Sequence, residues 1–319
     1  MDKPSILVSG ASGIVGYGIL RSLRQLKDQY RLIGSTIYDF SAADLYSDIV
    51  LKALPTDHPN YLEWLCDSIN KHQVAMVIPG IECDMLKWNK HSREILSAGA
   101  LPLLNNKTLI ELCNDKWEFY KALMLSHSRY AISTRIEASF SEYPLPFILK
   151  PRRGYGSKGI IKVTTKGEFE KNKERIGQEL IQQPLVGTDD EEYTVSAFFD
   201  NESLLIDLLP LKRKLSAAGY TQEAEFTEFD FTEVIKELAF TFKPTGPTNF
   251  QFRKEKDEMK LLEINPRISS ATSIRTALGY NESKMSIDYF LNNTLPTRLD
   301  RSMIRGAHVI RYIEDHIFL

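Results

Sequence analysis

Three polar residues late in the chain are spaced so that they could act on a metal ion and a phosphate. Glu263, Asn265 and Arg267 alternate along the predicted strand Leu-Leu-Glu-Ile-Asn-Pro-Arg. Side chains two residues apart on a strand point to the same face, and a carboxylate beside an amide oxygen is a ligand pair that Mg²⁺ accepts. The planar guanidinium of an arginine suits phosphoryl or carboxylate oxygens. This spacing indicates a site for a divalent metal and an oxyanion.

The preceding predicted strand repeats the same spacing. Asn249 and Gln251 are also two residues apart, and the polar turn 254–258 would join their strand to the strand that carries Glu263. In such a hairpin Gln251 and Glu263 lie on one face of the sheet, which makes Gln251 a third candidate metal ligand. The simpler alternative is a solvated polar hairpin at the edge of a sheet.

A lysine followed by glycines forms the second candidate site. Lys150 ends a predicted strand, and Gly154, Gly156, Ser157 and Gly159 precede the next strand. Glycines allow backbone N–H groups to approach phosphate oxygens, and a lysine supplies a positive charge. The Walker A pattern is absent and no helix follows. An ordinary glycine-rich hairpin is the alternative.

The elements that must position these residues change character near residue 105. Before it, short apolar runs alternate with amphipathic stretches, which predicts an α/β unit with a Rossmann-like parallel sheet. After it, short strands dominate and predict an α+β unit. The predicted helices are 13–27, 61–71, 83–96, one ending near 126, 169–176, 231–240 and one from 273. The predicted strands include 5–9, 31–37, 74–79, 204–209, 248–253, 259–264 and 308–312, with an irregular polar stretch at 212–230.

The first turn of the chain supports a different function. Gly10, Gly13 and Gly16 follow a predicted strand and open a helix, and Asp39 ends the second strand. A dinucleotide-binding turn has this context, so an NAD(P)-dependent oxidoreductase is an alternative hypothesis. The glycines could equally serve only to pack a strand closely against a helix.

Composition excludes several classes of protein. The 319 residues are 43% hydrophobic and 26% charged with a net charge of −2, which is typical of a globular protein of about two domains. This charge predicts no nucleic-acid partner, and no apolar run reaches the ~18 residues of a transmembrane helix, so no membrane partner is expected. The three cysteines form no CxxC pair. We therefore expect reduced thiols and a cytoplasmic location.

Further motifs complete an ordered set. They are Asn114-Asp-Lys116, Gln182-Gln-Pro-Leu-Val-Gly187, Glu192-Tyr-Thr-Val195 and Thr272-Ser-Ile-Arg-Thr-Ala-Leu-Gly-Tyr-Asn281. Together with the Lys150 strand and the 249–267 hairpin, their order resembles the ATP-grasp superfamily, closest to short proteins similar to the carbamoyl-phosphate synthase large chain. The resemblance covers the whole chain. It implies a Rossmann-like pre-ATP-grasp domain at 1–105 and an ATP-grasp domain at 106–319, with a lid subdomain at about 146–185.

The resemblance also implies roles for individual residues. The ATP-binding residues would be Lys116 and Lys150 at the phosphates, Gly154, Gly156, Ser157 and Gly159 in a covering loop, Gln183 and Leu185 beside adenine, and Glu192 at the ribose. The metal ligands would be Gln251, Glu263 and Asn265, with Glu263 bridging two Mg²⁺ ions for which Mn²⁺ may substitute. Arg267 and Lys150 would be catalytic, because both would stabilise the transferring phosphoryl group.

The implied activity is that of a carboxylate-amine ligase. A substrate carboxylate would attack the γ-phosphate of ATP to give an acylphosphate and ADP, and an amine or a thiol would then displace phosphate. Arg213 and Glu82 are the candidate substrate-binding residues, and the partners would be small molecules, with the assembly open between a monomer and a homodimer. Ser270-Ala271 stands where the family often has Gly-Gly, and the chain ends soon after the core, which argues against a bicarbonate-dependent carboxylase. A non-catalytic ATP-binding protein is the remaining alternative.

Overall fold

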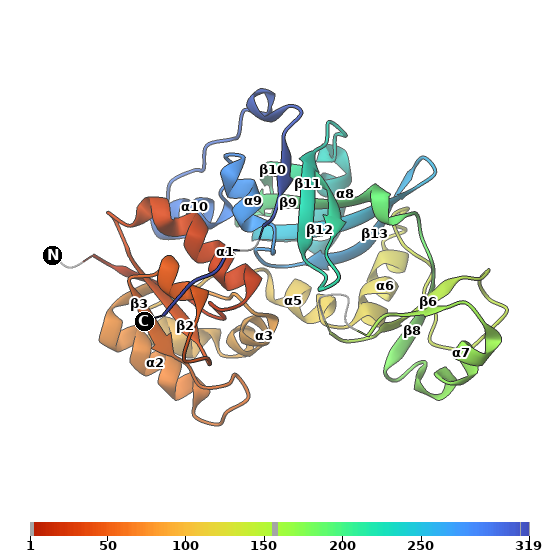
Figure 1. Cartoon of the computed structure of the whole chain (residues 1–319), viewed down its shortest axis with the longest axis horizontal. Coiled ribbons are helices and arrows are strands. Elements are labelled where there is room, and N and C mark those ends of the chain that lie inside the picture. Colours follow the sequence, from red (N-terminus) through yellow and green to blue (C-terminus); the bar gives the residue numbers. More distant parts are fainter. Residues whose placement is uncertain (1–2, 155–158, 313, 319) are drawn as a thin grey trace.

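The computed structural model describes residues 3–154, 159–312 and 314–318, which form three sheets. The first sheet is parallel and lies in the N-terminal lobe (Figure 1). Its strand order is β3-β2-β1-β4-β5. The strands are β1 (Ser5–Val8), β2 (Arg31–Thr36), β3 (Ile49–Lys52), β4 (Val74–Ile78) and β5 (Leu101–Pro102). The helices that cover it are α1 (Ile14–Leu23), α2 (Tyr61–His72), α3 (Glu82–Lys90) and α4 (Ser92–Ser97).

Both faces of this sheet are buried, as its apolar strands require. Ile6 and Val8 of β1 pack in the core that contains α1, and Leu7 packs in the core that contains α2. All four residues of β1 are buried. The alternation of side chains on one strand therefore supplies two separate cores.

The central sheet carries most of the polar residues predicted above. Its strand order is β13-β12-β9-β10-β11-β14, and every pair in it is antiparallel. The strands are β9 (Glu192–Phe199), β10 (Leu205–Leu215), β11 (Thr221–Phe226), β12 (Gly246–Glu255), β13 (Glu258–Asn265) and β14 (His308–Ile310). The predicted hairpin is confirmed, since Gln251 pairs with Glu263 and Asn249 pairs with Asn265.

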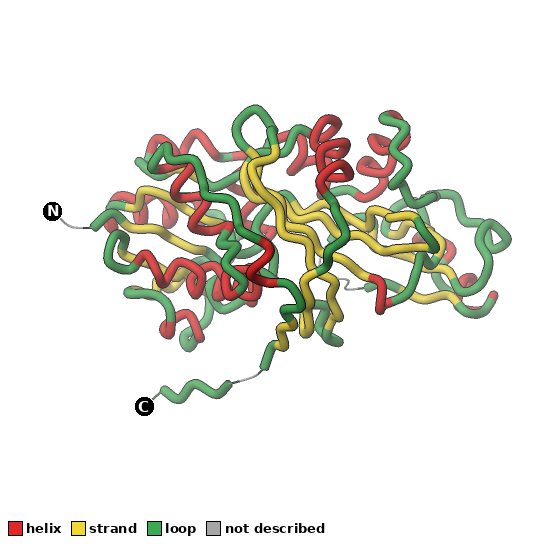
Figure 2. Tube along the Cα trace, turned by 90° about the horizontal axis from the view of Figure 1, so that it is seen from above, coloured by secondary structure: helices red, strands yellow, loops and turns green. Residues whose placement is uncertain are grey.

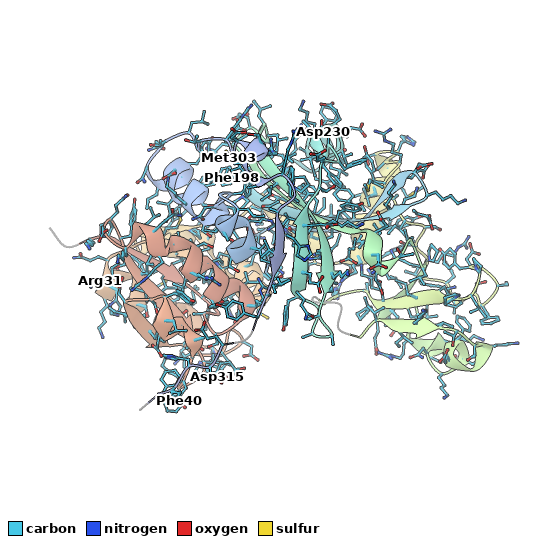
Figure 3. The ribbon with its side chains drawn as sticks, turned by 45° about the horizontal axis from the view of Figure 1, so that its top comes forward. Arg31, Phe40, Phe198, Asp230, Met303 and Asp315 are labelled. Carbon is cyan, nitrogen blue, oxygen red and sulfur yellow. The ribbon has the colours of Figure 1, made fainter. Side chains whose placement is uncertain are left out.

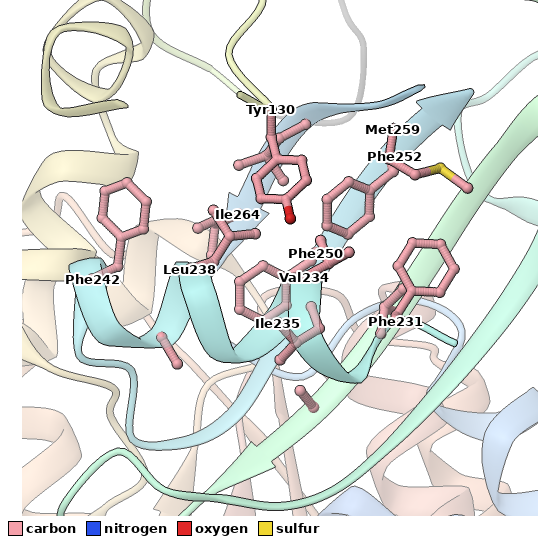
Figure 4. Close-up of a cluster of buried hydrophobic side chains, with 14 of the residues drawn as sticks. Tyr130, Phe231, Val234, Ile235, Leu238, Phe242, Phe250, Phe252, Met259 and Ile264 are labelled. Carbon is pink, nitrogen blue, oxygen red and sulfur yellow. The ribbon is translucent and has the colours of Figure 1, made fainter. Parts of the chain in front are cut away.

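The two faces of the central sheet differ in chemistry. Helix α8 (Thr232–Phe242) packs Val234, Leu238 and Phe242 against one face, where Phe250 and Phe252 of β12 meet it (Figure 4). Residues that alternate with these along β9, β12 and β13 point to the opposite face. On this opposite face, Gln251, Arg253 and Glu263 line one of the cavities described below, whereas Phe198 of β9 packs in a separate core with residues of α9 and α10.

A third, small sheet lies at the end of the molecule away from the N-terminal lobe (Figures 1 and 2). Its strand order is β7-β6-β8, with β6 (Phe147–Pro151), β7 (Ile161–Val163) and β8 (Leu180–Pro184), and α7 (Lys166–Glu170) packs on it. Phe147, Phe169 and Leu180 belong to its separate core. Helices α5 (Lys107–Cys113) and α6 (Lys116–Leu125) connect the N-terminal lobe to this region.

The chain returns to the N-terminal lobe after β13. Helices α9 (Thr272–Ala277) and α10 (Glu282–Ser286), with the turn of helix that follows (Ile287–Leu291), pack on α1 (Figure 1). Ile268 and Ile287 are buried in the same core as β1 and α1. Asn281 donates from Nδ2 to the carbonyl oxygen of Ser22 at 2.8 Å. The last residues also reach this lobe, where Phe318 lies against Phe40 with ring centroids 5.1 Å apart, and Figure 3 shows Asp315 near Phe40.

The motif that begins at Thr272 joins this returning segment to the central sheet. Arg275 is fully buried and donates to Thr194 Oγ1 at 2.9 Å and to Asn249 Oδ1 at 2.6 Å. It also forms an ion pair with Glu282, 3.3 Å away. Burial lowers the pKa of Arg275, an effect that Glu282 opposes. The motif therefore has a structural role in this chain.

The predicted fold class, α/β followed by α+β, is confirmed. Several predicted boundaries are wrong. The range 83–96 forms two helices separated at His91, and the helix predicted at 169–176 is instead α7 (Lys166–Glu170). The stretch 212–230, predicted as irregular, contains the end of β10 and all of β11. The last error arose because polar residues pair with neighbouring strands there. Within the described ranges, no helix is long and apolar enough to cross a membrane.

Candidate functional site

Two adjoining cavities lie between the small sheet and the polar face of the central sheet. The wide cavity has a volume of about 500 Å³ and the narrow cavity about 40 Å³. Apolar side chains from both sheets line the wide cavity, including Ile148, Ile160, Val186 and Leu215. A pocket of this size accepts a small organic ligand. Polar residues that line both cavities are Lys116, Lys150, Gln183 and Glu263.

Two lysines reach the junction of the cavities from different elements. Lys150 lies on β6, and its Nζ donates to the carbonyl oxygen of Leu262 at 3.4 Å. Burial lowers the pKa of Lys150, and the negative charge of Glu263 opposes this effect. Lys116 opens α6, and its Nζ donates to the carbonyl oxygen of Gly154 at 2.7 Å. The junction is therefore a place of concentrated positive charge.

Glu263 is the acidic partner of these lysines. Burial raises its pKa, but the Lys150 ammonium and a hydrogen bond from Asn265 outweigh burial, so the pKa lies below its usual value. Asn265 donates from Nδ2 to Glu263 Oε1 at 3.0 Å. The two side chains share one face of β13, as the sequence predicted. Because the amide donates through its nitrogen, its oxygen is the atom that could face a cation.

Arg267 and Glu82 meet across the boundary between the N-terminal lobe and the central sheet. Arg267 Nη2 lies 3.3 Å from Glu82 Oε2, and both side chains are mostly buried. Glu82 opens α3 and lines the narrow cavity. Two residues that are 185 positions apart in the sequence are thus brought to one place.

Glu192 has a different environment from the one expected for a ribose-binding residue. Arg213 donates to its Oε1 through Nε and Nη2, at 3.1 and 2.8 Å. Arg253 donates to its Oε2 through the same two groups, at 2.9 and 2.8 Å. Four N–H groups thus occupy the carboxylate, whose capacity is about four hydrogen bonds. Glu192 lines the wide cavity, but its charge is balanced by two arginines.

Arg213 and Gln251 belong to the same polar network. Arg213 Nη2 also donates to Gln251 Oε1 at 2.8 Å, and the Arg213 side chain is 5% exposed. The structure places Arg213 inside the sheet network, away from Glu82, with which it was paired as a candidate substrate residue. The amide oxygen of Gln251 already accepts a charged donor, which makes it a poorer metal ligand than Asn265.

The remaining predicted residues lie around the wide cavity. Gln183 and Leu185 line it, and Gln183 Nε2 donates to Thr134 Oγ1 at 2.8 Å. Gly154 lines both cavities, whereas Gly159 packs against Pro151. Gly156 and Ser157 fall outside the described residues.

Sequence reasoning missed three charged residues of the wide cavity, which are Lys162, Asp189 and Arg253. Arg253 and Asp189 both line it and form an ion pair of 2.7 Å between Arg253 Nη2 and Asp189 Oδ1. The spacing that singled out Asn249 and Gln251 extends to Arg253, two residues further along β12, so the alternation alone could have found it. Asp189 precedes β9 and had no such signal.

Comparison with known proteins decides what fold these elements form. Residues 180–315 match the family model described as "ATP-grasp in the biosynthetic pathway with Ter operon". The structure resembles N5-carboxyaminoimidazole synthetase from Staphylococcus aureus in complex with ADP, with a TM-score of 0.72 and 13% identity over 92% of this chain and 79% of that chain. The fold is ATP-grasp.

Two further solved structures share this arrangement. The biotin carboxylase domain of 2-oxoglutarate carboxylase from Hydrogenobacter thermophilus, in complex with MgADP, ADP and bicarbonate, has a TM-score of 0.73 and 13% identity over 96% of this chain and 73% of that chain. An L-amino acid ligase from Bacillus licheniformis has a TM-score of 0.68 and 15% identity over 98% of this chain and 78% of that chain. No curated protein matches the sequence. The predicted resemblance to the ATP-grasp superfamily is confirmed.

Proposed function

We propose that the chain is an ATP-dependent ligase that activates a substrate carboxylate as an acylphosphate for attack by an amine. The observation that carries this proposal is the junction of the two cavities, where Lys116, Lys150 and Glu263 line both. A nucleotide in the wide cavity would direct its phosphates to these groups. The narrow cavity, with Asn265 and Glu82 in its wall, would then hold the reacting carboxylate.

The wide cavity suits ATP in both size and chemistry. Its apolar walls, near Ile148 and Val186, would enclose the adenine, and the backbone at Gln183 and Leu185 would contact the base edge. Lys116 and Lys150 would hold the phosphates, with Gly154 close beside them. The carboxylate of Glu192 already accepts hydrogen bonds from Arg213 and Arg253. A contact between Glu192 and the ribose would require these arginines to move away from it.

Glu263 and Asn265 are suited to Mg²⁺. Glu263 is ionised because Lys150 and Asn265 hold its pKa below the usual value, and carboxylate and amide oxygens are the ligands that Mg²⁺ accepts. The metal, when bound, would neutralise phosphate charge. We extend the proposal to two Mg²⁺ ions, with Mn²⁺ as a substitute and Gln251 as a weaker ligand.

Arg267 and Lys150 would act on the transferring group. In phosphoryl transfer, positioning and electrostatic stabilisation supply most of the rate acceleration. Arg267 is anchored by Glu82, a residue that lines the narrow cavity, so its guanidinium is held beside that residue. An acylphosphate hydrolyses in water, and a lid that excludes water would protect it.

The domain limits belong to the same proposal. We propose a division into residues 1–105 and 106–319, with residues 146–185 as the lid, since the small sheet has its own core. A homodimer and a cytoplasmic location also remain predictions of the sequence.

The test is acid-dependent release of ADP. Purified protein with Mg-ATP is incubated with a panel of carboxylic acids and amines, and ADP is measured with and without each acid. We expect ADP release that requires both Mg²⁺ and one class of acid. Glu263→Gln should abolish this turnover while circular dichroism and the melting temperature show an intact fold.

Two results would contradict the proposal. Full turnover in Glu263→Gln would contradict the assignment of Glu263 to the active site. Mg-ATP binding without ADP release for any acid would favour a non-catalytic ATP-binding protein. The oxidoreductase alternative predicts NAD(P)H binding at the N-terminal turn, which a thermal-shift assay with NAD(P)H and with Mg-ATP can measure.

A further inference from the structure

A third cavity, which the proposed function leaves without a role, lies in the N-terminal lobe. We call it the N-terminal cavity, and its volume is about 900 Å³, larger than the wide cavity. It opens at the carboxyl ends of four parallel strands, and the residues that follow β1, β2, β3 and β4 all line it. Ligands of open parallel sheets bind at this edge.

Gly13, which lines this cavity, is packed less closely than the nearby Gly16 and Gly80. A Cβ on Gly16 would lie 2.5 Å from Gly10 O, and a Cβ on Gly80 would lie 2.0 Å from Ser9 O. A Cβ on Gly13 would meet only Gly10 O, at 3.3 Å. The backbone of Gly13 has φ −83° and ψ 155°, which any residue can adopt. A side chain at Gly13 would therefore occupy space at the wall of the cavity.

Helix α3 is the partition between the N-terminal cavity and the reaction centre. Glu82, at its start, lines the narrow cavity, whereas Asp84 and Lys87 line the N-terminal cavity. Leu86 lines both. A molecule in the N-terminal cavity would therefore be separated from the narrow cavity by the side chain of Leu86.

The volumes show where a substrate can be accommodated. The narrow cavity, at about 40 Å³, has room for a reacting group but none for the body of a substrate. The wide cavity, at about 500 Å³, would be filled by the nucleotide. Of the described cavities next to the reaction centre, the N-terminal cavity is large enough for the rest of the acid.

The walls of the N-terminal cavity indicate what kind of molecule it holds. Most of the lining surface is apolar, with Ile37, Tyr38, Leu54 and Ile81 among the residues that form it. Three hydroxyls of its lining are already bonded within the protein: those of Ser12 and Thr36 bond to each other at 2.5 Å, and that of Thr56 donates to Asp84 at 2.6 Å.

The charges of this lining also weigh against a phosphorylated ligand. Lys87 and Lys90 line the cavity together with Asp57 and Asp84, so the two charges of each sign balance. Asp39, the residue that a dinucleotide would need at its ribose, is instead bound to Lys52 Nζ at 2.5 Å. A phosphate or a dinucleotide would find no excess of positive charge here.

We propose that the N-terminal cavity binds the body of the carboxylate substrate, and that this substrate is an acid with an apolar, unphosphorylated body. The proposal rests on the proposed function, since it places the reacting carboxylate beside Glu82 and Arg267. It narrows the substrate class to acids with an aromatic or branched aliphatic group.

The experiment separates binding in this cavity from binding of the nucleotide. Isothermal titration calorimetry is performed on protein saturated with Mg-ADP, with 3-phenylpropanoate and 4-methylpentanoate as apolar probes and ribose 5-phosphate and NAD⁺ as phosphorylated probes. Ala53→Phe places a ring in the cavity, because Ala53 lines it. Ala138→Phe adds the same ring at an exposed position away from the lining residues.

We expect an apolar acid to bind and its Kd to rise at least about tenfold in Ala53→Phe but not in Ala138→Phe, since a ring that fills a pocket removes the space for a ligand. Tyr38→Ala, which removes a largely exposed part of the apolar wall, should weaken binding without unfolding the protein. The Tyr38→Ala variant tests the inference even if Ala53→Phe does not fold.

Three outcomes would overturn the inference: no apolar probe binds, the cavity variants bind it as wild type does, or ribose 5-phosphate or NAD⁺ binds in its place. The Kd of Mg-ADP is measured in a separate titration of the protein without nucleotide. If the wild-type protein does not bind Mg-ADP, the proposed function itself is contradicted. This result can be told apart from a failure of the acid to bind in the N-terminal cavity.

Discussion

The turn after β1 and the turn after β6 are both rich in glycine, but the space around their glycines differs. Around the first, an added Cβ on Gly16 or Gly80 would overlap backbone atoms at 2.5 Å or less. Around the second, an added Cβ on Gly154 would meet nothing within 4 Å, although Gly154 has φ +121°. Gly16 and Gly80 are therefore closely packed, whereas Gly154 has free space beside it and lines both cavities.

This contrast shows that a glycine pattern does not by itself indicate a ligand. In the first turn, Gly16 and Gly80 let a strand, a helix and a second strand approach one another, which is the packing alternative weighed from the sequence. In the second turn, Gly154 carries the carbonyl that Lys116 contacts. The neighbours of each glycine, which only the fold supplies, separate the two cases.

The largest effect is expected at the second turn, from loss of the lysine beside it. Lys150→Met should reduce ADP formation about 10²- to 10³-fold, because it removes a fixed charge from the phosphate site. Lys162→Met is the matched control, since Lys162 also lines the wide cavity but is exposed. Steady-state kinetics should show a small effect for the control. Equal losses in both variants would contradict the special role of Lys150.

At the first turn the expected effect is on stability. Gly16→Ala should lower the free energy of unfolding by about 3 kcal/mol or more, because the new Cβ overlaps backbone that cannot move aside. Gly13→Ala, three residues earlier, should cost less than about 1 kcal/mol. Urea unfolding followed by circular dichroism measures both, and similar values for the two would show that the turn is not rigidly packed.

A milder change is expected at Gly154. Gly154→Ala should destabilise the protein by about 1 kcal/mol, since an alanine is strained at a positive φ while the site has free space. The Kd for Mg-ATP should rise a few-fold, because the backbone that bounds both cavities shifts. A loss of 3 kcal/mol would mean that the second turn is packed like the first.

The smallest effect is a pH dependence at Glu263. Because Lys150 and Asn265 outweigh burial and hold its folded pKa below the usual value of a glutamate, folding favours the ionised form. This stabilisation is present above that value and is lost as the pH falls through the folded pKa. Glu263→Gln should therefore lose less stability than wild type between about pH 5 and pH 3. Parallel stability curves for the two proteins would contradict the lowered pKa.

The sequence predicted the polar hairpin well, because alternation on paired strands needs only local information. Glu263, Asn265 and Gln251 lie on one face as expected. It also predicted that Lys150 and Glu263 would belong to one site, although this came from the order of motifs. The contact of Arg267 with Glu82 depends on how the lobes pack, which no local pattern contains.

Long-range pairing also explains what could not be predicted. Glu192 was expected to be available to a ligand, but Arg213 and Arg253 come to it from neighbouring strands on either side of β9. Strand β11 (TQEAEF) was missed because most of its residues are polar, and because its partners are β10 and the distant β14.

The return of the chain to its first lobe has a consequence for synthesis on the ribosome. Ile268 and Ile287 complete the core that contains β1 and α1, and Asn281 closes a hydrogen bond to α1. When the first hundred residues leave the ribosome, the outer surface of α1 is still uncovered, and it stays so until almost the whole chain has been made. The part of the protein synthesised first is thus among the last to be finished.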